Sequence, residues 1–178
     1  MVFLRRGLAA CAGLFVLMCA PAAQAASGTI IALGTSNTRG RGVDPSQSYP
    51  SQLQAALKAR GRNARVINRG VNGASSLEVL AQAASVPAGT TLVLFEYARN
   101  NDTAKGVSNG PANMATLQSQ LAAKGVRSID VTGAFASEYR RAFANGLLVN
   151  DHGPHLNPQG HAELVQSIIS DVEAALAH

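Results

Sequence analysis

The stretch Thr29-Ile30-Ile31-Ala32-Leu33-Gly34-Thr35-Ser36 runs from a continuous apolar segment into a small polar turn. An apolar run of this length is typical of a strand that is buried on both faces, as in a parallel sheet. Three further runs, the last of them weaker, have the same character, and glycine follows two of them. They cover residues 65–68, 91–95 and 126–131.

Helical patterns follow each of these runs. Apolar residues at helical spacing predict helices over 52–60, 75–84, 112–124 and 158–177. The alternation of strand and helix predicts a doubly wound parallel sheet in a single α/β domain. Ligands in such folds bind beyond the carboxyl ends of the strands, so the informative loops are those at Gly34, Gly70, Tyr97 and Gly133.

The first 25 residues have the composition of an export signal. Two arginines precede an apolar run over 8–20, and Ala23-Gln24-Ala25 has the small-x-small pattern of a cleavage site. The apolar run is short for a membrane span. We therefore expect cleavage after Ala25, a secreted or periplasmic location, and a functional domain over residues 26–178.

Composition restricts the possible functions. Aromatic residues make up only 4% of the 178 residues and tryptophan is absent, which argues against a stacking surface for nucleic acid. The net charge is +5, and without the two arginines of the leader it is +3, which carries little information about partners. Both cysteines, Cys11 and Cys19, lie in the leader, so no disulfide or thiol chemistry is expected in the remaining chain.

The loop after the first strand presents Ser36 at the carboxyl edge of the expected sheet. Its hydroxyl can act as a nucleophile if a base reaches it, or it can be an ordinary turn serine. The segment lacks the glycine and lysine pattern of a phosphate-binding loop and the glycine spacing of a dinucleotide site.

Two further loops offer groups that could stabilise an oxyanion. The N–H of Gly73 faces the start of a predicted helix, and Asn100 and Asn101 follow the third strand. Each loop also has a simple structural interpretation, a glycine-rich turn in one case and an asparagine-rich turn in the other.

Residues 151–161 contain three histidines: His152, His155 and His161. The segment lacks the HExxH pattern of a zinc site and has only Asp151 as a carboxylate in its first half. We expect no metal. The preferred interpretation is one histidine as a general base with a preceding acid to orient its ring, whereas His161 can simply pack on its helix.

The four loops, in this order, resemble the sequence blocks of the SGNH (GDSL-type) hydrolases, and are similar to the small secreted bacterial branch with arylesterase and lysophospholipase/thioesterase-like members. The resemblance extends over essentially the whole chain after the leader. It implies a flavodoxin-like three-layer α/β/α sandwich, with a parallel sheet of four or five strands. The segments that carry it are 31–38, 48–53, 66–73 and 155–161.

The resemblance also implies roles for individual residues. Ser36 would be the nucleophile, His155 its base and Asp151 the acid that orients the base. The oxyanion hole would use the backbone N–H groups of Ser36 and Gly73 and the side-chain amide of Asn100 or Asn101. No cofactor or metal is implied.

The sequence departs from the family pattern at several points. Thr35 stands where the family has an aspartate that is not catalytic, and Arg99 stands where a small residue is expected. The third block has one extra residue, so counting from the strand selects Asn100 and counting back from Asp102 selects Asn101. The fourth block is also one residue longer, because Asp151 lies four positions before its histidine and His152 occupies the expected position.

The expected function is a serine ester hydrolase for small acyl or aryl esters, with thioesters and lysophospholipids as further candidates. The alternatives are a catalytically impaired binding module of the same fold and a carbohydrate O-acetyl esterase. The expected partner is a small-molecule ester, without nucleic acid and without stable membrane insertion once the signal is removed. The oligomeric state stays open.

Overall fold

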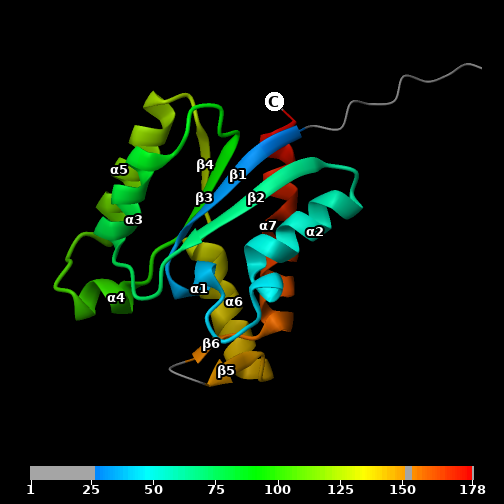
Figure 1. Cartoon of the computed structure of the whole chain (residues 1–178). Helices are drawn as coiled ribbons and strands as arrows, with labels where there is room; N and C mark the ends of the chain where they lie inside the picture. Colours follow the sequence, from blue (N-terminus) through cyan, green and yellow to red (C-terminus); the bar gives the residue numbers. More distant parts are fainter. Residues whose placement is uncertain (1–26, 151–153, 178) are drawn as a thin grey trace, which may run out of the picture.

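The computed structural model describes residues 27–150 and 154–177, so the expected signal peptide and Asp151 lie outside the described residues. Four parallel strands form the main sheet in the order β2-β1-β3-β4 (Figure 1). The expected parallel sheet of four or five strands is therefore confirmed with four. The strands are β1 (Ser27–Gly34), β2 (Asn63–Gly70), β3 (Leu92–Phe95) and β4 (Arg127–Asp130), and a small antiparallel pair follows, β5 (Leu148–Asn150) and β6 (Pro154–Leu156).

Helices cover both faces of the sheet and complete the three-layer sandwich (Figure 1). One face is covered by α3 and α5, and the other by α2, α6 and α7. None of the described helices is long and apolar enough to cross a membrane. The helices are α1 (Ser36–Arg39), α2 (Tyr49–Ala59), α3 (Ser76–Gln82), α4 (Arg99–Ala104), α5 (Gly110–Ala123), α6 (Thr132–Asn145) and α7 (Pro158–Leu176), with 3-10 turns at η1 (Pro45–Gln47) and η2 (Ala83–Ser85).

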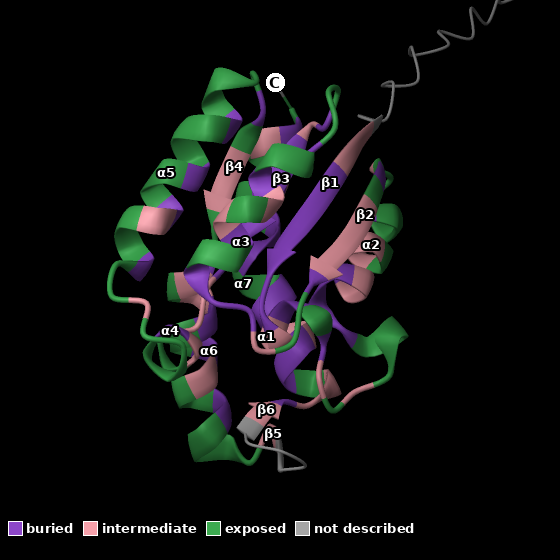
Figure 2. Cartoon of the chain, turned by 60° about the vertical axis from the view of Figure 1, so that its left-hand side comes forward, coloured by how far each residue is buried: buried purple, intermediate pink, exposed green. Residues whose placement is uncertain are grey.

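The apolar run of β1 supplies both hydrophobic cores. Successive side chains of a strand point to opposite faces. Ile31 and Leu33 accordingly pack with α3 and α5, whereas Ile30 and Ala32 pack with α2, α6 and α7. Figure 2 shows the consequence: β1 is buried over its apolar run, while β2 at the sheet edge is mostly half-buried.

Three helices are not predicted by the sequence pattern: the short α1 in the Ser36 loop, α4 and α6. The pattern gives no helix over Thr132–Asn145, because only three residues of α6, Phe135, Glu138 and Ala142, are buried and one of these is an acid. The asparagine-rich segment after β3, expected as a turn, is instead the start of α4. The amides of Asn101 and Asp102 both bond to the carbonyl of Ala98, which begins the helix.

Candidate active site

The topology places the loops after β1 and β3 beside each other. From β1 the chain goes to β2 on one side of it, and then crosses over to β3 on the other side. The direction of strand order in the sheet therefore reverses between β1 and β3. A crevice at the carboxyl ends of the strands is the general consequence of such a reversal. The residues that follow β1 and β3 line one cleft, together with residues of α4 and α6.

The central contact of the site joins Ser36 to His155. Ser36 is the first residue of α1, and His155 lies in β6, 119 positions later in the sequence. The Nε2 atom of His155 is 3.1 Å from the Oγ atom of Ser36. In the tautomer with its proton on Nδ1, the imidazole accepts the serine proton at Nε2.

Glu96 holds the turn that carries Ser36. Its buried carboxylate accepts hydrogen bonds from the backbone N–H of Thr35 at 2.6 Å and from the hydroxyls of Thr35 and Thr38 at 3.0 and 2.8 Å. Burial raises the pKa of Glu96, and the hydrogen bonds from the two threonines oppose that rise. The sequence reasoning missed this residue. The available signal was an acid placed directly after a fully apolar strand.

Gly70 allows β2 to approach this turn closely. A Cβ atom at Gly70 would overlap the backbone nitrogen of Arg39, and Asn68 bonds to the carbonyl of Thr38 across the same contact at 2.8 Å. The Ser36 turn is therefore fixed from two sides, by Glu96 directly after β3 and by the end of β2.

The loop after β2 presents Gly73 next to the same strand ends. The N–H of Val71 bonds to the carbonyl of Gly34 at 2.9 Å, and a turn follows in which Gly73 has a φ of +71°. Among residues 27–150 and 154–177, the backbone N–H groups of Ser36 and Gly73 have no hydrogen-bond partner. A backbone N–H without a protein partner is the kind of group that can bind a developing negative charge.

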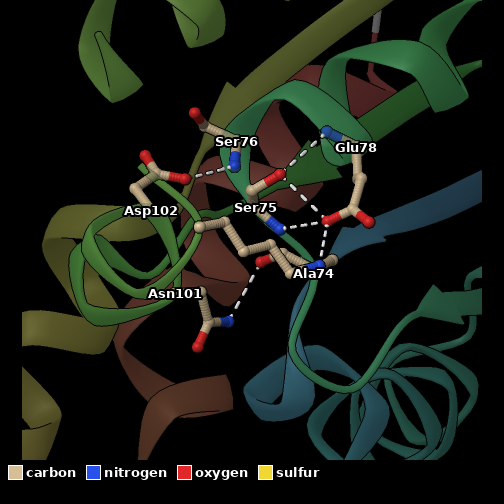
Figure 3. A network of polar contacts seen from close by, with 7 residues as sticks. Ala74, Ser75, Ser76, Glu78, Asn101 and Asp102 are labelled. Atoms are coloured by element: carbon tan, nitrogen blue, oxygen red, sulfur yellow. Dashed lines mark hydrogen bonds and ion pairs between the residues drawn. The ribbon is translucent and has the colours of Figure 1, made fainter. Parts of the chain in front are cut away.

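The start of α4 docks on this loop through two adjacent residues, which Figure 3 shows. The Nδ2 atom of Asn101 donates to the carbonyl of Ala74 at 3.0 Å. The Oδ1 atom of buried Asp102 accepts from the backbone N–H of Ser76 at 2.6 Å, at the first residue of α3. Asn100 also lines the cleft, but its side chain is exposed and makes none of these contacts.

Of the other candidate residues in the histidine segment, the structure describes only His161. Asp151 and His152 lie outside the described residues. His161 is buried in the first turns of α7, and its ring nitrogens have no hydrogen-bond partner in the described part of the chain. Burial, with a smaller effect from the charge of His155, lowers the pKa of His161 to about 4. The described residues contain no group of three possible metal ligands.

The cleft has a volume of about 800 Å³. One wall is the segment from Tyr97 to Asn101, and the opposite wall is a single stripe of α6 with side chains three or four positions apart. Ser36, Asn37, Glu96 and His155 complete the lining. The α6 residues are Thr132, Phe135, Ala136, Tyr139 and Arg140.

No protein-family model and no curated protein matches this chain. Solved structures match most of it. AlinE4, an SGNH-hydrolase family esterase, is 25% identical, with 84% of this chain and 97% of AlinE4 covered at a TM-score of 0.57. The psychrotrophic esterase EstA from Pseudoalteromonas sp. is 17% identical, with 85% of this chain and 100% of EstA covered at a TM-score of 0.66. A carbohydrate acetylesterase family member from Sinorhizobium meliloti is 18% identical, with 85% of this chain and 100% of the matched chain covered at a TM-score of 0.56.

A three-layer α/β sandwich with a serine and a histidine in contact at the reversal point of its sheet has the architecture of the serine ester hydrolases. Within that class, this chain is similar to SGNH (GDSL-type) hydrolases: AlinE4 is a member of that family, and two further matching structures are of lipolytic proteins of the G-D-S-L family.

Proposed function

We propose that Ser36 is the nucleophile and His155 the general base of an esterase that acts on small acyl or aryl esters. The observation that carries this proposal is the 3.1 Å contact between Ser36 Oγ and His155 Nε2 in the cleft. A hydroxyl within hydrogen-bond distance of an imidazole is the arrangement that activates a serine.

The reaction has two steps. Ser36 Oγ attacks the ester carbonyl carbon while His155 takes its proton, and that proton passes to the leaving alcohol as the ester bond breaks. Water then attacks the acyl-enzyme with His155 again as base, which releases the acid and restores Ser36. Neither step needs a cofactor or metal.

We assign the oxyanion hole to the backbone N–H groups of Ser36 and Gly73 and the side-chain amide of Asn101. Asn101 is favoured over Asn100 because its amide lies against the Gly73 loop, where it uses one N–H on Ala74. An amide carries two N–H donors, so the second can bind the oxyanion.

Asp151 is proposed as the group that orients the His155 ring, on the basis of its position four residues earlier in the sequence. An Asp151→Asn variant should then retain binding and lose most of kcat, because an orienting carboxylate also stabilises the imidazolium. Unchanged kcat would identify a Ser36–His155 dyad.

The decisive experiment is hydrolysis of p-nitrophenyl acetate at pH 8 by the purified protein and by Ser36→Ala. Ser119→Ala is the matched control, because Ser119 is exposed on α5. We expect activity in the parent and the control only. No activity in the well-folded parent would instead favour the binding-module alternative.

Carbohydrate O-acetyl esters are the second substrate class to test. The similarity to a carbohydrate acetylesterase family member supports this class through the shared fold. Release of acetate from an acetylated sugar, compared with p-nitrophenyl acetate, separates the two: a higher kcat/KM on the sugar ester would favour the carbohydrate O-acetyl esterase. Thioesters and lysophospholipids belong to the same comparison.

We also propose that residues 1–25 are an export signal and that residues 26–178 are the working domain. The two arginines, the apolar run and the Ala-Gln-Ala pattern before residue 26 support export. Expression of the full chain in a bacterial host, followed by amino-terminal sequencing of the exported protein, should give Ala26 as the first residue. Retention of the intact chain in the cytoplasm would contradict the proposal.

A further inference from the structure

Two arginines line the cleft beside the Ser36–His155 pair. Arg99 is the first residue of α4, and Arg140 lies on the stripe of α6 that faces the cleft. Both side chains are exposed. Arg99 occupies the position where the family pattern has a small residue, so it adds a positive charge to the cleft lining.

Neither arginine has an acidic partner among residues 27–150 and 154–177. The neighbouring Arg141 pairs with Glu138 and Glu163, whereas the one side-chain hydrogen bond of Arg140 to a described residue goes to the hydroxyl of Ser137 at 3.2 Å. The other ion pairs of the described residues also lie elsewhere. They join Arg60 and Arg62 to Glu173, and Lys105 to Glu78.

The described lining of the cleft contains a single carboxylate, that of Glu96. Glu96 is only 1% exposed, and its oxygens accept hydrogen bonds from Thr35 and Thr38. It therefore cannot form an ion pair with either arginine inside the cleft. The accessible fixed charge on these two walls is positive, a condition that concentrates anions in a cleft.

We propose that Arg99 and Arg140 bind an anionic group of the substrate, a carboxylate or a phosphate, while Ser36 attacks the ester carbonyl. This inference rests on the proposed esterase function and specifies further that the ester substrate carries a negative charge. A guanidinium offers a planar fork of N–H donors that matches both anions. Tyr97 and Tyr139, on the same two walls, flank the uncharged part of the substrate.

The test compares pairs of esters in which one member carries an additional carboxylate. For the acyl side, kcat/KM is measured for p-nitrophenyl hemisuccinate and p-nitrophenyl butyrate. For the alcohol side, it is measured for 4-carboxyphenyl acetate and phenyl acetate. Inhibition of butyrate hydrolysis by succinate and by inorganic phosphate then identifies which anion is preferred.

Each measurement is repeated with Arg99→Gln, Arg140→Gln and, as the charge-matched control, Arg127→Gln at the exposed first residue of β4. We expect either a preference for one anionic ester or competitive inhibition by one anion. Removal of either cleft arginine should reduce that preference or inhibition about tenfold. The control variant should leave it unchanged, and raised salt should weaken it.

Two failures are distinguishable. If neutral esters are hydrolysed in a Ser36-dependent manner, but all charged-to-neutral ratios stay near one and neither anion inhibits, the anion site is wrong and the esterase proposal stands. A preference that persists in both cleft variants also overturns the site. If no ester is hydrolysed, and Arg99→Gln and Arg140→Gln bind succinate and phosphate as the parent does in calorimetry, both proposals fail.

Discussion

The carboxylate of Glu96 lies 2.6 Å from the backbone nitrogen of Thr35, and this contact ties the end of β3 to the turn that begins at the end of β1. The two strands are neighbours in the sheet, and the contact forms where they both end. Because Thr38 bonds to the same carboxylate, the residues on both sides of Ser36 are held by one buried group. The position of the proposed nucleophile thus depends on an acid that never contacts substrate in the proposed reaction.

Replacement of Glu96 by Gln should impair both stability and catalysis. The amide keeps one acceptor oxygen but loses the negative charge and one acceptor, which weakens the hydrogen bonds from Thr35 and Thr38 at a cost of about 1–3 kcal/mol in the free energy of unfolding. We expect kcat to fall more than KM rises, measured with p-nitrophenyl acetate beside urea denaturation. Glu173→Gln, which affects only surface ion pairs with Arg60 and Arg62, should change the stability by less than about 1 kcal/mol. Equal effects of the two variants would show that Glu96 does not hold the turn.

The two asparagines of the third loop should behave differently. Asn101→Ala removes the proposed oxyanion donor and should lower kcat about 100- to 1,000-fold. Asn100→Ala, at an exposed position of the same cleft, should change kcat by less than about threefold. Steady-state kinetics on p-nitrophenyl acetate measures both, with thermal unfolding to check the fold. The reverse order of the two effects would reassign the oxyanion donor to Asn100.

Buried His161 should make the folded state sensitive to acid. Its pKa is lowered to about 4, below the ordinary value of 6.5, so the unfolded chain binds a proton first as the pH falls. Stability from this group is complete above about pH 6.5 and is lost as the pH falls toward 4, by a total of about 3 kcal/mol. Urea denaturation at pH 7 and pH 4 should show a smaller loss for His161→Leu than for the parent. Parallel losses in the two proteins would contradict a buried neutral His161.

The sequence predicts the sheet well because its signals are local. The uninterrupted apolar run from Ile30 to Leu33 favours burial on both faces, and a central parallel strand provides that. The helix α6 could not be predicted in this way. Its inward stripe is partly the wall of a cleft, so polar residues such as Thr132 and Arg140 replace the apolar ones that mark a core helix.

The site shows the same division between local and long-range signals. Ser36 and His155 stand out as residue types at the ends of predicted elements, and the fold brings them together. The choice between Asn100 and Asn101 depends on a contact with Ala74, 27 positions away from Asn101, which no counting along the chain can supply. The role of Glu96 depends on Thr35 and Thr38 across two strands, and a single buried acid gives no spacing pattern to recognise.

Covalent labelling of Ser36 reports whether His155 activates this serine as a nucleophile. The purified protein is treated with a fluorophosphonate, digested, and mapped by mass spectrometry, beside His155→Gln. We expect one phosphonyl group on the peptide that contains Ser36, formed much more slowly in the variant. Absence of label from the folded parent, or label on a different serine, would show that Ser36 is not the activated nucleophile.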